Sequence, residues 1–373
     1  MFLKNLYSLI MQNNQAIPFN KENFKQILSK EFAWVIVISI PAALLADYFN
    51  IPLAWFLGPM IITSIVTLGG IRTKMPRLVL STVLIFLGLY IGNYIDQDLF
   101  AQMHQWVWTS LIMLAYIIIS VLLVSKYLQK FSGYEKKTSI FSAAPGALGP
   151  LLILAEDEKS DLSQVATSHL IRLIIIITIF PFIVNSLYET ENIEKIEKVI
   201  LNQNLFDLII LVVLSIVLII IFDKLKIPAA LLAGTLFASG FLQITDMASY
   251  QLPPNIIDYC LLILGSSVGC RFADKTFKEI AKNSAHSFVA TFLLVILGVI
   301  AAFVAGAVID KNFFTLLLSY CPGGIYEVAV IAIFFDLDPE FVSFHHIIRL
   351  LMILFVVPLI LKFIYKNKKT RVV

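Results

Sequence analysis

Long apolar stretches alternate with short polar connections along nearly the whole chain. Each is about long enough to cross a lipid bilayer as a helix. Within the stretches the apolar residues cover all sides, and Gly and Pro are interspersed, which favours membrane helices over β-strands. The pattern therefore predicts an all-α integral membrane protein with candidate spans at residues 32–49, 51–70, 76–95, 106–128, 138–155, 163–187, 205–225, 227–245, 254–272, 286–309, 313–335 and 341–363.

A polar segment from Thr190 to Asn204 (TENIEKIEKVILNQN) separates these stretches into two sets. We therefore divide the chain at this segment. The expected parts are a cytoplasmic lead-in (1–31), a first membrane repeat (32–187), a linker (188–204), a second membrane repeat (205–363) and a basic cytoplasmic tail (364–373).

The two sets are copies of one unit. Ile51-Pro52 recurs 176 positions later as Ile227-Pro228. Later matches share an offset of 177, and so many pairs in one register are not a chance result. They are Gly88 and Gly92 with Gly265 and Gly269, Pro145-Gly146 with Pro322-Gly323, Asp161 with Asp338, His169 with His346, Arg172 with Arg349, and Pro181 with Pro358.

The placement of Lys and Arg predicts that the two repeats cross the membrane in opposite directions, because short cytoplasmic loops are enriched in these residues. In the first repeat they precede the first stretch and follow the second and fourth. In the second repeat they follow the first and third stretches. The residues are Lys21, Lys25, Lys30, Arg72, Lys74, Arg77, Lys126, Lys130, Lys136 and Lys137, and then Lys224, Lys226, Arg271, Lys275, Lys278 and Lys282.

Opposite orientation requires an odd number of crossings in each half, so one stretch per half must fail to cross. The fifth stretch of each half contains a Pro-Gly break, SAAPGALGP (142–150) and SYCPGGIYE (319–327). We therefore expect two inverted-topology repeats, each with about five crossings and one broken or re-entrant segment. Both termini would then be cytoplasmic. Paired broken segments in inverted halves are typical of a transporter's substrate site.

Composition agrees with a membrane protein. Of the 373 residues, 59% are hydrophobic and 14% are charged. A soluble domain carries about 25% charged residues. The net charge of +3 is too small and scattered to indicate a nucleic-acid partner. The three cysteines lie in apolar stretches without a CxxC pattern, which indicates free buried thiols.

The breaks at Pro145-Gly146 and Pro322-Gly323-Gly324 are the first candidate binding residues. Proline removes an amide donor and glycine permits unusual backbone angles, so a helix can unwind there and offer its backbone to a ligand. A half-helix that starts after a break suits an anion. The alternative is a structural kink, which is common in membrane helices.

Glu327 follows the second break and precedes an apolar run. A charge near the centre of a bilayer costs roughly 2.5–3.5 kcal/mol on insertion scales. One interpretation is a carrier of a proton or cation. The other is a salt-bridged structural acid. The equivalent residue of the first repeat is Pro150, so the repeat itself does not require an acid.

An H-x-x-R pair opens the sixth stretch of each half: His169 with Arg172, and His346 with Arg349. This spacing places both side chains on one helix face, and His345 also lies four residues before Arg349. The arginines are candidates to bind a carboxylate substrate or to neutralise Glu327. The alternative is that they lie at the interface and reach the lipid headgroups.

Metal and cofactor sites are not expected. The histidines make no HxxxH or ExxH pattern, and no P-loop or dinucleotide fingerprint is present. The glycine pairs Gly88/Gly92 and Gly265/Gly269 predict close helix packing instead.

Several motifs resemble the bacterial AbrB-type membrane protein family, namely IPLAWFLGPM, LGLYIG with LGSSVG, CPGGIYE and HHIIRL. The resemblance covers roughly residues 32–363, and its most specific part maps onto Pro322, Gly323, Gly324, Glu327, His346 and Arg349. This duplicated family is labelled ammonia monooxygenase or regulator, and its general plan is similar to that of sodium/proton exchangers and bile-acid carriers. The first repeat departs from the motif at Ala147 and Pro150, so a site shared by both halves would be asymmetric.

The sequence therefore favours a secondary transporter of a small solute such as an organic anion, coupled to protons or sodium, in a bacterial inner membrane. A membrane-embedded regulator or sensor is the main alternative, and a membrane monooxygenase is a weaker one. The expected partners are the lipid bilayer and a small molecule or ion. The sequence leaves open whether the chain forms a homo-oligomer.

Overall fold

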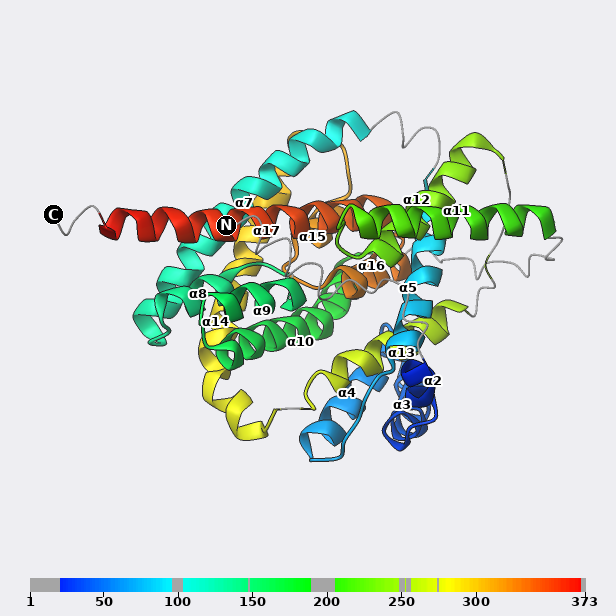
Figure 1. Cartoon of the computed structure of the whole chain (residues 1–373), viewed down its shortest axis with the longest axis horizontal. Helices are drawn as coiled ribbons and strands as arrows, with labels where there is room; N and C mark the ends of the chain where they lie inside the picture. Colours follow the sequence, from blue (N-terminus) through cyan, green and yellow to red (C-terminus); the bar gives the residue numbers. More distant parts are fainter. Residues whose placement is uncertain are drawn as a thin grey trace.

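The computed structural model describes residues 21–95, 103–146, 148–188, 205–247, 252, 256–273 and 275–369, and its regular elements are helices (Figure 1). Six of them are long and apolar enough to cross a membrane, and further apolar helices are shorter. The chain is thus an all-α membrane protein, as the apolar pattern predicts. The predicted linker (188–204) lies, except for Tyr188, outside the described residues, as do residues 1–20 of the lead-in.

Lipid as the surrounding solvent explains the surface of the molecule. In α11 (Leu205–Lys224) only 17% of the most apolar 18-residue stretch is buried inside the protein. Val212, Val213 and Ile216 of this helix are exposed. A soluble protein rarely exposes such a continuous apolar face, whereas hydrocarbon chains can cover it without cost.

One group of helices, here called the scaffold bundle, contains the first three stretches of each repeat. Its closest pairs are α4 with α13 and α5 with α12, so each pair joins a helix of the first repeat to a helix of the second. Its members are α2 (Lys21–Ile27), α3 (Lys30–Tyr48), α4 (Ala54–Leu68), α5 (Arg77–Gly92), α11, α12 (Ala230–Thr245) and α13 (Ile256–Cys270).

The remaining elements form a second group, here called the hairpin bundle. Long helix α7 packs against α14 and α17, and the two bundles approach each other where α16 contacts α5 and α13. Its members are η1 (Met103–Gln105), α7 (Trp106–Phe131), α8 (Lys136–Ala143), α9 (Leu148–Asp157), α10 (Leu162–Leu187), α14 (Phe277–Gly306), α15 (Phe313–Tyr320), α16 (Ile325–Phe334) and α17 (Pro339–Lys369).

The fifth stretch of the first repeat is a hairpin made of α8 and α9. Lys137 at the start of α8 forms an ion pair of 2.6 Å with Glu158, just after α9. The amide of Asp161 also donates to Thr138 Oγ1 over 3.1 Å. The segment therefore enters, turns at the Pro-Gly break and returns to the level where it began.

The second repeat contains the equivalent hairpin, made of α15 and α16. Lys311, before α15, pairs with Asp338, after α16, at 2.6 Å. Thr315 Oγ1 donates to the same carboxylate over 3.0 Å. This arrangement agrees with the predicted re-entrant segment in each half.

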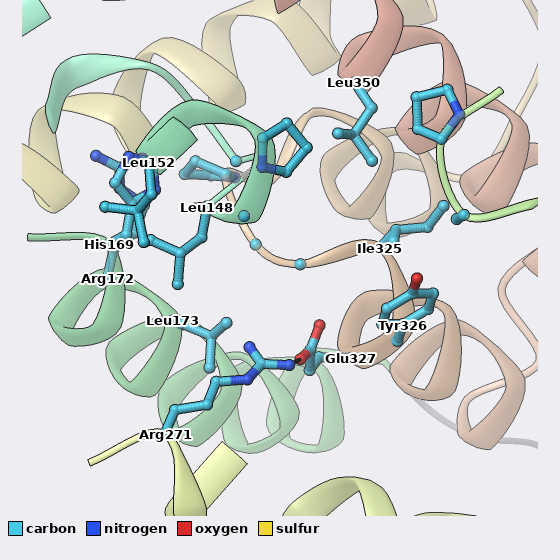
Figure 2. Close-up of a pocket in the computed structure, with 18 residues that line it drawn as sticks. Leu148, Leu152, His169, Arg172, Leu173, Arg271, Ile325, Tyr326, Glu327 and Leu350 are labelled. Carbon is cyan, nitrogen blue, oxygen red and sulfur yellow. Dashed lines mark hydrogen bonds and ion pairs between the residues drawn. The ribbon is translucent and has the colours of Figure 1, made fainter. Parts of the chain in front are cut away.

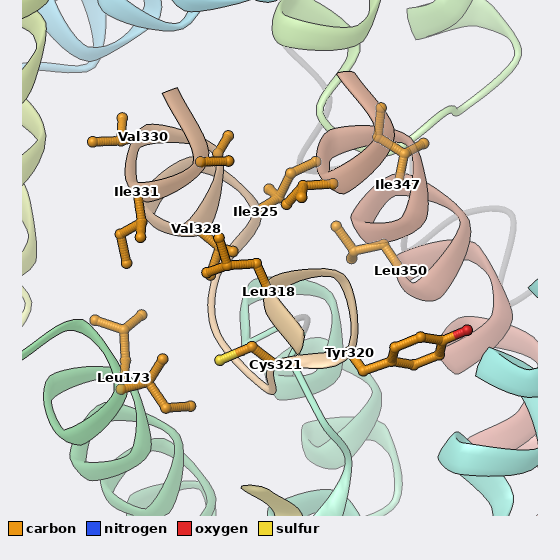
Figure 3. Packing of buried hydrophobic residues seen from close by; sticks show 14 of the residues in the cluster. Leu173, Leu318, Tyr320, Cys321, Ile325, Val328, Val330, Ile331, Ile347 and Leu350 are labelled. Carbon is orange, nitrogen blue, oxygen red and sulfur yellow. The ribbon is translucent and has the colours of Figure 1, made fainter. Parts of the chain in front are cut away.

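Apolar packing holds the second hairpin in place. Figure 3 shows Cys321 and Val328 beside the break, with Leu350 of α17 and Leu173 of α10 around them. These residues belong to the large buried cluster of the protein. The break is thus fixed in the interior.

Two short helices of the scaffold bundle begin in the same unusual way. Leu53 and Ala229 precede α4 and α12, and both have left-handed backbone angles, with φ of +54° and +56°. They occupy equivalent positions of the two repeats, each directly after an Ile-Pro pair. The matching strain in both copies supports the duplication inferred from the sequence.

The glycine pairs have the packing role that their spacing predicts. A Cβ atom at Gly88 would meet Thr235 and Leu232 of α12, and one at Gly265 would overlap the carbonyl oxygen of Phe56 in α4. Only glycine lets these helices approach so closely.

Two helices extend beyond the predicted spans. Helix α14 begins at Phe277, nine residues before the expected span at 286, and α17 continues to Lys369, into the region predicted as a tail. The apolar parts of these helices, Ser284–Gly306 and Pro339–Ile364, agree with the predicted spans. Charged residues precede the apolar part of α14 and follow that of α17, with no proline or glycine to end the helix.

Candidate functional site

A cavity of about 500 Å³ lies where the two helix breaks come together (Figure 2). Its walls come from both hairpins, from α10 and α17, and from the scaffold bundle, so both repeats and both bundles contribute. Of the residues predicted for the site, the lining includes Gly146, His169, Arg172, Pro322, Gly323, Gly324 and Glu327.

Each break is a tight three-residue turn centred on its proline. The amide of Gly146 donates to the carbonyl of Ala144 over 3.1 Å around Pro145. The amide of Gly323 donates to the carbonyl of Cys321 over 2.8 Å around Pro322. Gly146 has φ of +107°, an angle that side chains with a Cβ rarely adopt, and this explains the glycine of the first break.

The H-x-x-R pair of α10 binds the backbone of the first break. His169 Nε2 is 3.0 Å from the carbonyl oxygen of Phe141. Arg172 donates to the carbonyl oxygens of Ala144 and Ser142, both over 2.5 Å. These carbonyls have lost their helical partners at the break, so the arginine replaces the missing amide donors.

The pair in α17 repeats this arrangement at the second break. His346 Nε2 is 3.0 Å from the carbonyl oxygen of Leu318. Arg349 donates to the carbonyl oxygens of Cys321 and Gly323. The equivalent atoms in the two repeats therefore make equivalent contacts, at the offset of 177 found in the sequence.

Both arginines are deeply buried, with 2% of their surface exposed, so the interpretation that they reach lipid headgroups is wrong. Within the described part of the chain neither Arg172 nor Arg349 forms an ion pair, and the Nε atom of each lacks a hydrogen-bond partner. Within that part, the two guanidinium groups contact carbonyl oxygens and, for Arg349, Nδ1 of His346 at 3.1 Å, and no carboxylate balances their charge. The cavity beside Arg172 is correspondingly a favourable place for an anion.

Glu327 is paired with a residue that the site prediction omitted. Its Oε1 lies 2.7 Å from Nη2 of Arg271, at the end of α13 in the scaffold bundle (Figure 2). The expectation that Arg349 or Arg172 would neutralise Glu327 is therefore wrong. Arg349 donates its hydrogen bonds to the carbonyls of the second break, so the ion-pair partner of Glu327 comes from the scaffold bundle.

Pro145, His345, His346 and Arg349 lie outside the lining of the cavity, although His346 and Arg349 contact the backbone of the second break. His345 Nε2 is 2.8 Å from Thr109 Oγ1, and its Nδ1 is 2.9 Å from the carbonyl oxygen of Phe341. Its ring packs among Trp106, Phe341 and Phe344. This histidine therefore belongs to the structural core of the hairpin bundle.

Sequence reasoning did not assign Pro228, Ala229 and Arg271 to the site, although all three line the cavity. Pro228 was noted as a repeat marker and Arg271 as a loop charge. The signal in the sequence was that Pro228 belongs to the repeated Ile-Pro motif and that Arg271 comes two residues after the repeated LGSSVG motif. Among the residues that the structure describes, no three His, Cys, Asp or Glu side chains converge to hold a metal ion.

Comparisons with known proteins agree with the sequence motifs. A family model described as "Transition state regulatory protein AbrB" matches residues 2–96 and 67–365. The "Putative regulator AbrB" of Escherichia coli (strain K12) is 22% identical over 326 residues, covering 84% of this chain and 91% of the relative. The "Uncharacterized protein YhjN" of Bacillus subtilis (strain 168) is 20% identical over 350 residues, covering 87% and 91%. No solved structure gives a significant match.

Proposed function

The chain belongs to the AbrB family, and we propose that it is a secondary transporter of a small organic anion, coupled to protons or sodium ions. The observation that carries this proposal is the cavity between the two helix breaks. In inverted-repeat transporters, substrate and ion sites lie at such discontinuous segments near the middle of the membrane.

Charge favours an anion as the solute. Arg172 lines the cavity and Arg349 lies directly behind the breaks, and neither has an acidic partner in the described part of the chain. Among the described residues, an acid pairs with Arg271 but with neither Arg172 nor Arg349. The surplus of buried positive charge would be balanced by a bound carboxylate.

The position of the cavity between two bundles supports alternating access. Pro228, Ala229 and Arg271 form its scaffold wall, and the two breaks form the opposite wall. A displacement of the hairpin bundle relative to the scaffold bundle would change which side of the membrane the cavity faces. Such rigid-body movement around a fixed site is how inverted-repeat carriers work.

The proposed orientation follows from the loop charges. Both termini lie in the cytoplasm, and the protein spans a bacterial inner membrane. The first hairpin then enters from the cytoplasmic side, where Lys137 and Glu158 are, and the second enters from the opposite side, where Lys311 and Asp338 are.

Uptake into proteoliposomes tests the proposal. The solutes are radiolabelled monocarboxylates, dicarboxylates, tricarboxylates and amino acids, each supplied with an inward proton or sodium gradient and without one. We expect gradient-dependent uptake of at least one carboxylate, and Glu327→Gln is expected to abolish the dependence on the gradient.

Glu158→Gln is the matched control, because it removes an ion pair on the first hairpin outside the lining of the cavity. It should transport as the parent protein does. The proposal is wrong if folded, monodisperse protein moves none of these solutes under any gradient.

A second candidate function is a membrane-embedded regulator, which the descriptions of the family model and of the Escherichia coli relative favour. A regulator would form a stable complex with a signalling protein and would show no uptake. Affinity purification from membranes, analysed beside the transport assay, separates the two candidates.

A further inference from the structure

The ion pair between Arg271 and Glu327 connects the two bundles at the cavity. Arg271 follows the last helical turn of α13 in the scaffold bundle, and Glu327 lies in the first turn of α16 in the hairpin bundle. Nη2 of Arg271 lies 2.7 Å from Oε1 of Glu327, the distance of a short charge-assisted hydrogen bond. Any relative movement of the bundles must stretch or break this contact.

Arg271 also lines a second cavity, here called the vestibule, with a volume of about 710 Å³. The vestibule is lined on its other sides by Arg72, Lys74 and Glu31, among others, so it carries an excess of basic residues. The Arg271 side chain therefore borders both the vestibule and the cavity at the breaks. Among the described residues, Arg271 alone lines both of these cavities.

The burial of the two partners is unequal. The side chain of Glu327 is 1% exposed, whereas that of Arg271 is 29% exposed. The Glu327 carboxylate folds back over Gly324, where a Cβ atom would overlap its Oε2. Gly324 therefore makes room for the acid, and the arginine is the partner that can turn towards solvent.

We propose that Arg271 is a substrate-binding gate residue, and that the Glu327 carboxylate is an internal stand-in for the carboxylate of the solute. In the empty protein the Arg271–Glu327 pair separates the vestibule from the cavity. A carboxylate-bearing solute drawn in by Arg72 and Lys74 takes the place of Glu327 on the Arg271 guanidinium, and the passage opens. This inference rests on the proposed anion transport and names the residue that selects the solute.

The exchange is chemically balanced. Losing Glu327 alone would leave Arg271 without a counter-ion, which is costly at a partly buried site. A solute carboxylate restores the same charge-assisted hydrogen bond, so one carboxylate replaces another. A solute without a carboxylate or a similar anion could not open the gate in this way.

Thiol labelling tests the gate without any transport measurement. Leu152, on α9, lines the cavity and is only partly buried, so Leu152→Cys reports access to it in a background without Cys260, Cys270 and Cys321. The reagent is a membrane-impermeant, negatively charged methanethiosulfonate, applied to inside-out and right-side-out vesicles. Glu327→Gln and Arg271→Gln should each raise the labelling rate from the vestibule side about tenfold, a change of roughly 1.4 kcal/mol.

Two further variants separate gating from loss of fold. The exchange Arg271→Glu with Glu327→Arg restores opposite charges and should return labelling to the slow parent rate. Glu158→Gln removes an ion pair away from the cavity and should leave the rate unchanged. In a chain that keeps only Cys260, which is buried in α13, Glu327→Gln should leave that thiol unlabelled. Unchanged labelling of Leu152→Cys in Glu327→Gln from both sides would overturn the gate.

Thermal unfolding of the purified full-length protein tests the stand-in role of Glu327. Acetate, succinate, citrate and aspartate are the probes, with chloride at equal ionic strength as the reference. At least one carboxylate should stabilise Glu327→Gln at a concentration about tenfold lower than it does the parent protein, because the competing acid is gone. If none of them stabilises the variant more than the parent, the proposed exchange is wrong. Neither readout needs solute movement, so failure of the gate and failure of transport are separate results.

Discussion

Arg172 donates a hydrogen bond to the carbonyl oxygen of Ala144, and this contact joins the sixth stretch of the first repeat to the break in the fifth. Arg349 and Cys321 make the same contact in the second repeat. The H-x-x-R pairs thus hold the unwound backbone of the two breaks in shape.

Replacing Arg349 with glutamine should therefore destabilise the protein. The hydrogen bonds of the charged guanidinium to the carbonyls of Cys321 and Gly323 and to His346 are lost. Each is worth about 1.5–3 kcal/mol, so we expect a loss of about 3 kcal/mol or more. Arg349→Lys should lose less stability than Arg349→Gln, because lysine keeps the positive charge. It should still be less stable than the parent, because an ammonium group cannot donate to both carbonyls as the planar guanidinium does. The measurement is the apparent melting temperature in detergent. Equal melting of Arg349→Gln and the parent would show that the break does not depend on this residue.

Gly146→Ala should be destabilising, by about 1–3 kcal/mol, because the residue would be held at φ of +107°. Its Cβ atom would also lie 3.0 Å from Nη2 of Arg349, which comes from the other repeat. Gly149→Ala is the matched control: it lies three residues on in α9, and a Cβ atom there meets nothing within 4 Å. Helix propensity predicts that Gly149→Ala is neutral or stabilising by up to about 1 kcal/mol. Parallel melting curves compare the two, and equal melting of both variants would contradict the account.

Gly265→Ala should separate α13 from α4, because its Cβ atom would overlap the carbonyl oxygen of Phe56. Forcing extra volume into a packed interface costs about 1–3 kcal/mol. Gly306→Ala, near the end of α14, meets only Leu316 at 3.5 Å and should be tolerated. A lower melting temperature for Gly265→Ala alone is the expected result, whereas similar melting of both variants would argue against close packing as the role of Gly265.

Single cysteines on the two hairpins test the proposed inverted topology. Asp157 and Asp336 are both exposed; Asp157 is the last residue of α9 in the first hairpin, and Asp336 follows α16 in the second. In a cysteine-free background an impermeant maleimide should label Asp157→Cys from the cytoplasmic side and Asp336→Cys from the opposite side. Labelling of both from one side would mean that the repeats run parallel.

Much of the fold follows from residue patterns that a sequence exposes. All-round apolarity located the spans, because lipid imposes that pattern on any helix it surrounds. The Pro-Gly breaks at Pro145 and Pro322 identified the interrupted segments, since proline and glycine act on the local backbone. Glu327 was noticeable because a charge in an apolar run is costly.

Contacts between the bundles could not be predicted in the same way. Arg271 is 56 positions from Glu327, and nothing in the local sequence of either residue specifies the other. The contact of Arg349 with the carbonyls of the second break could not be predicted either, because spacing shows which helix face a side chain is on but not which backbone it reaches. The left-handed Leu53 and Ala229 carry side chains that give no warning of such angles.

The pairing of α4 with α13 and of α5 with α12 has a consequence for biosynthesis. When the ribosome has completed the first repeat, the partners of α4 and α5 have not yet been made. Helix α5 ends at Gly92 and α12 begins only at Ala230, 138 positions later, so α5 must stay in the membrane without its partner while this stretch is synthesised. Neither half, expressed alone, would contain a complete bundle, whereas the two halves produced together as separate chains could still assemble.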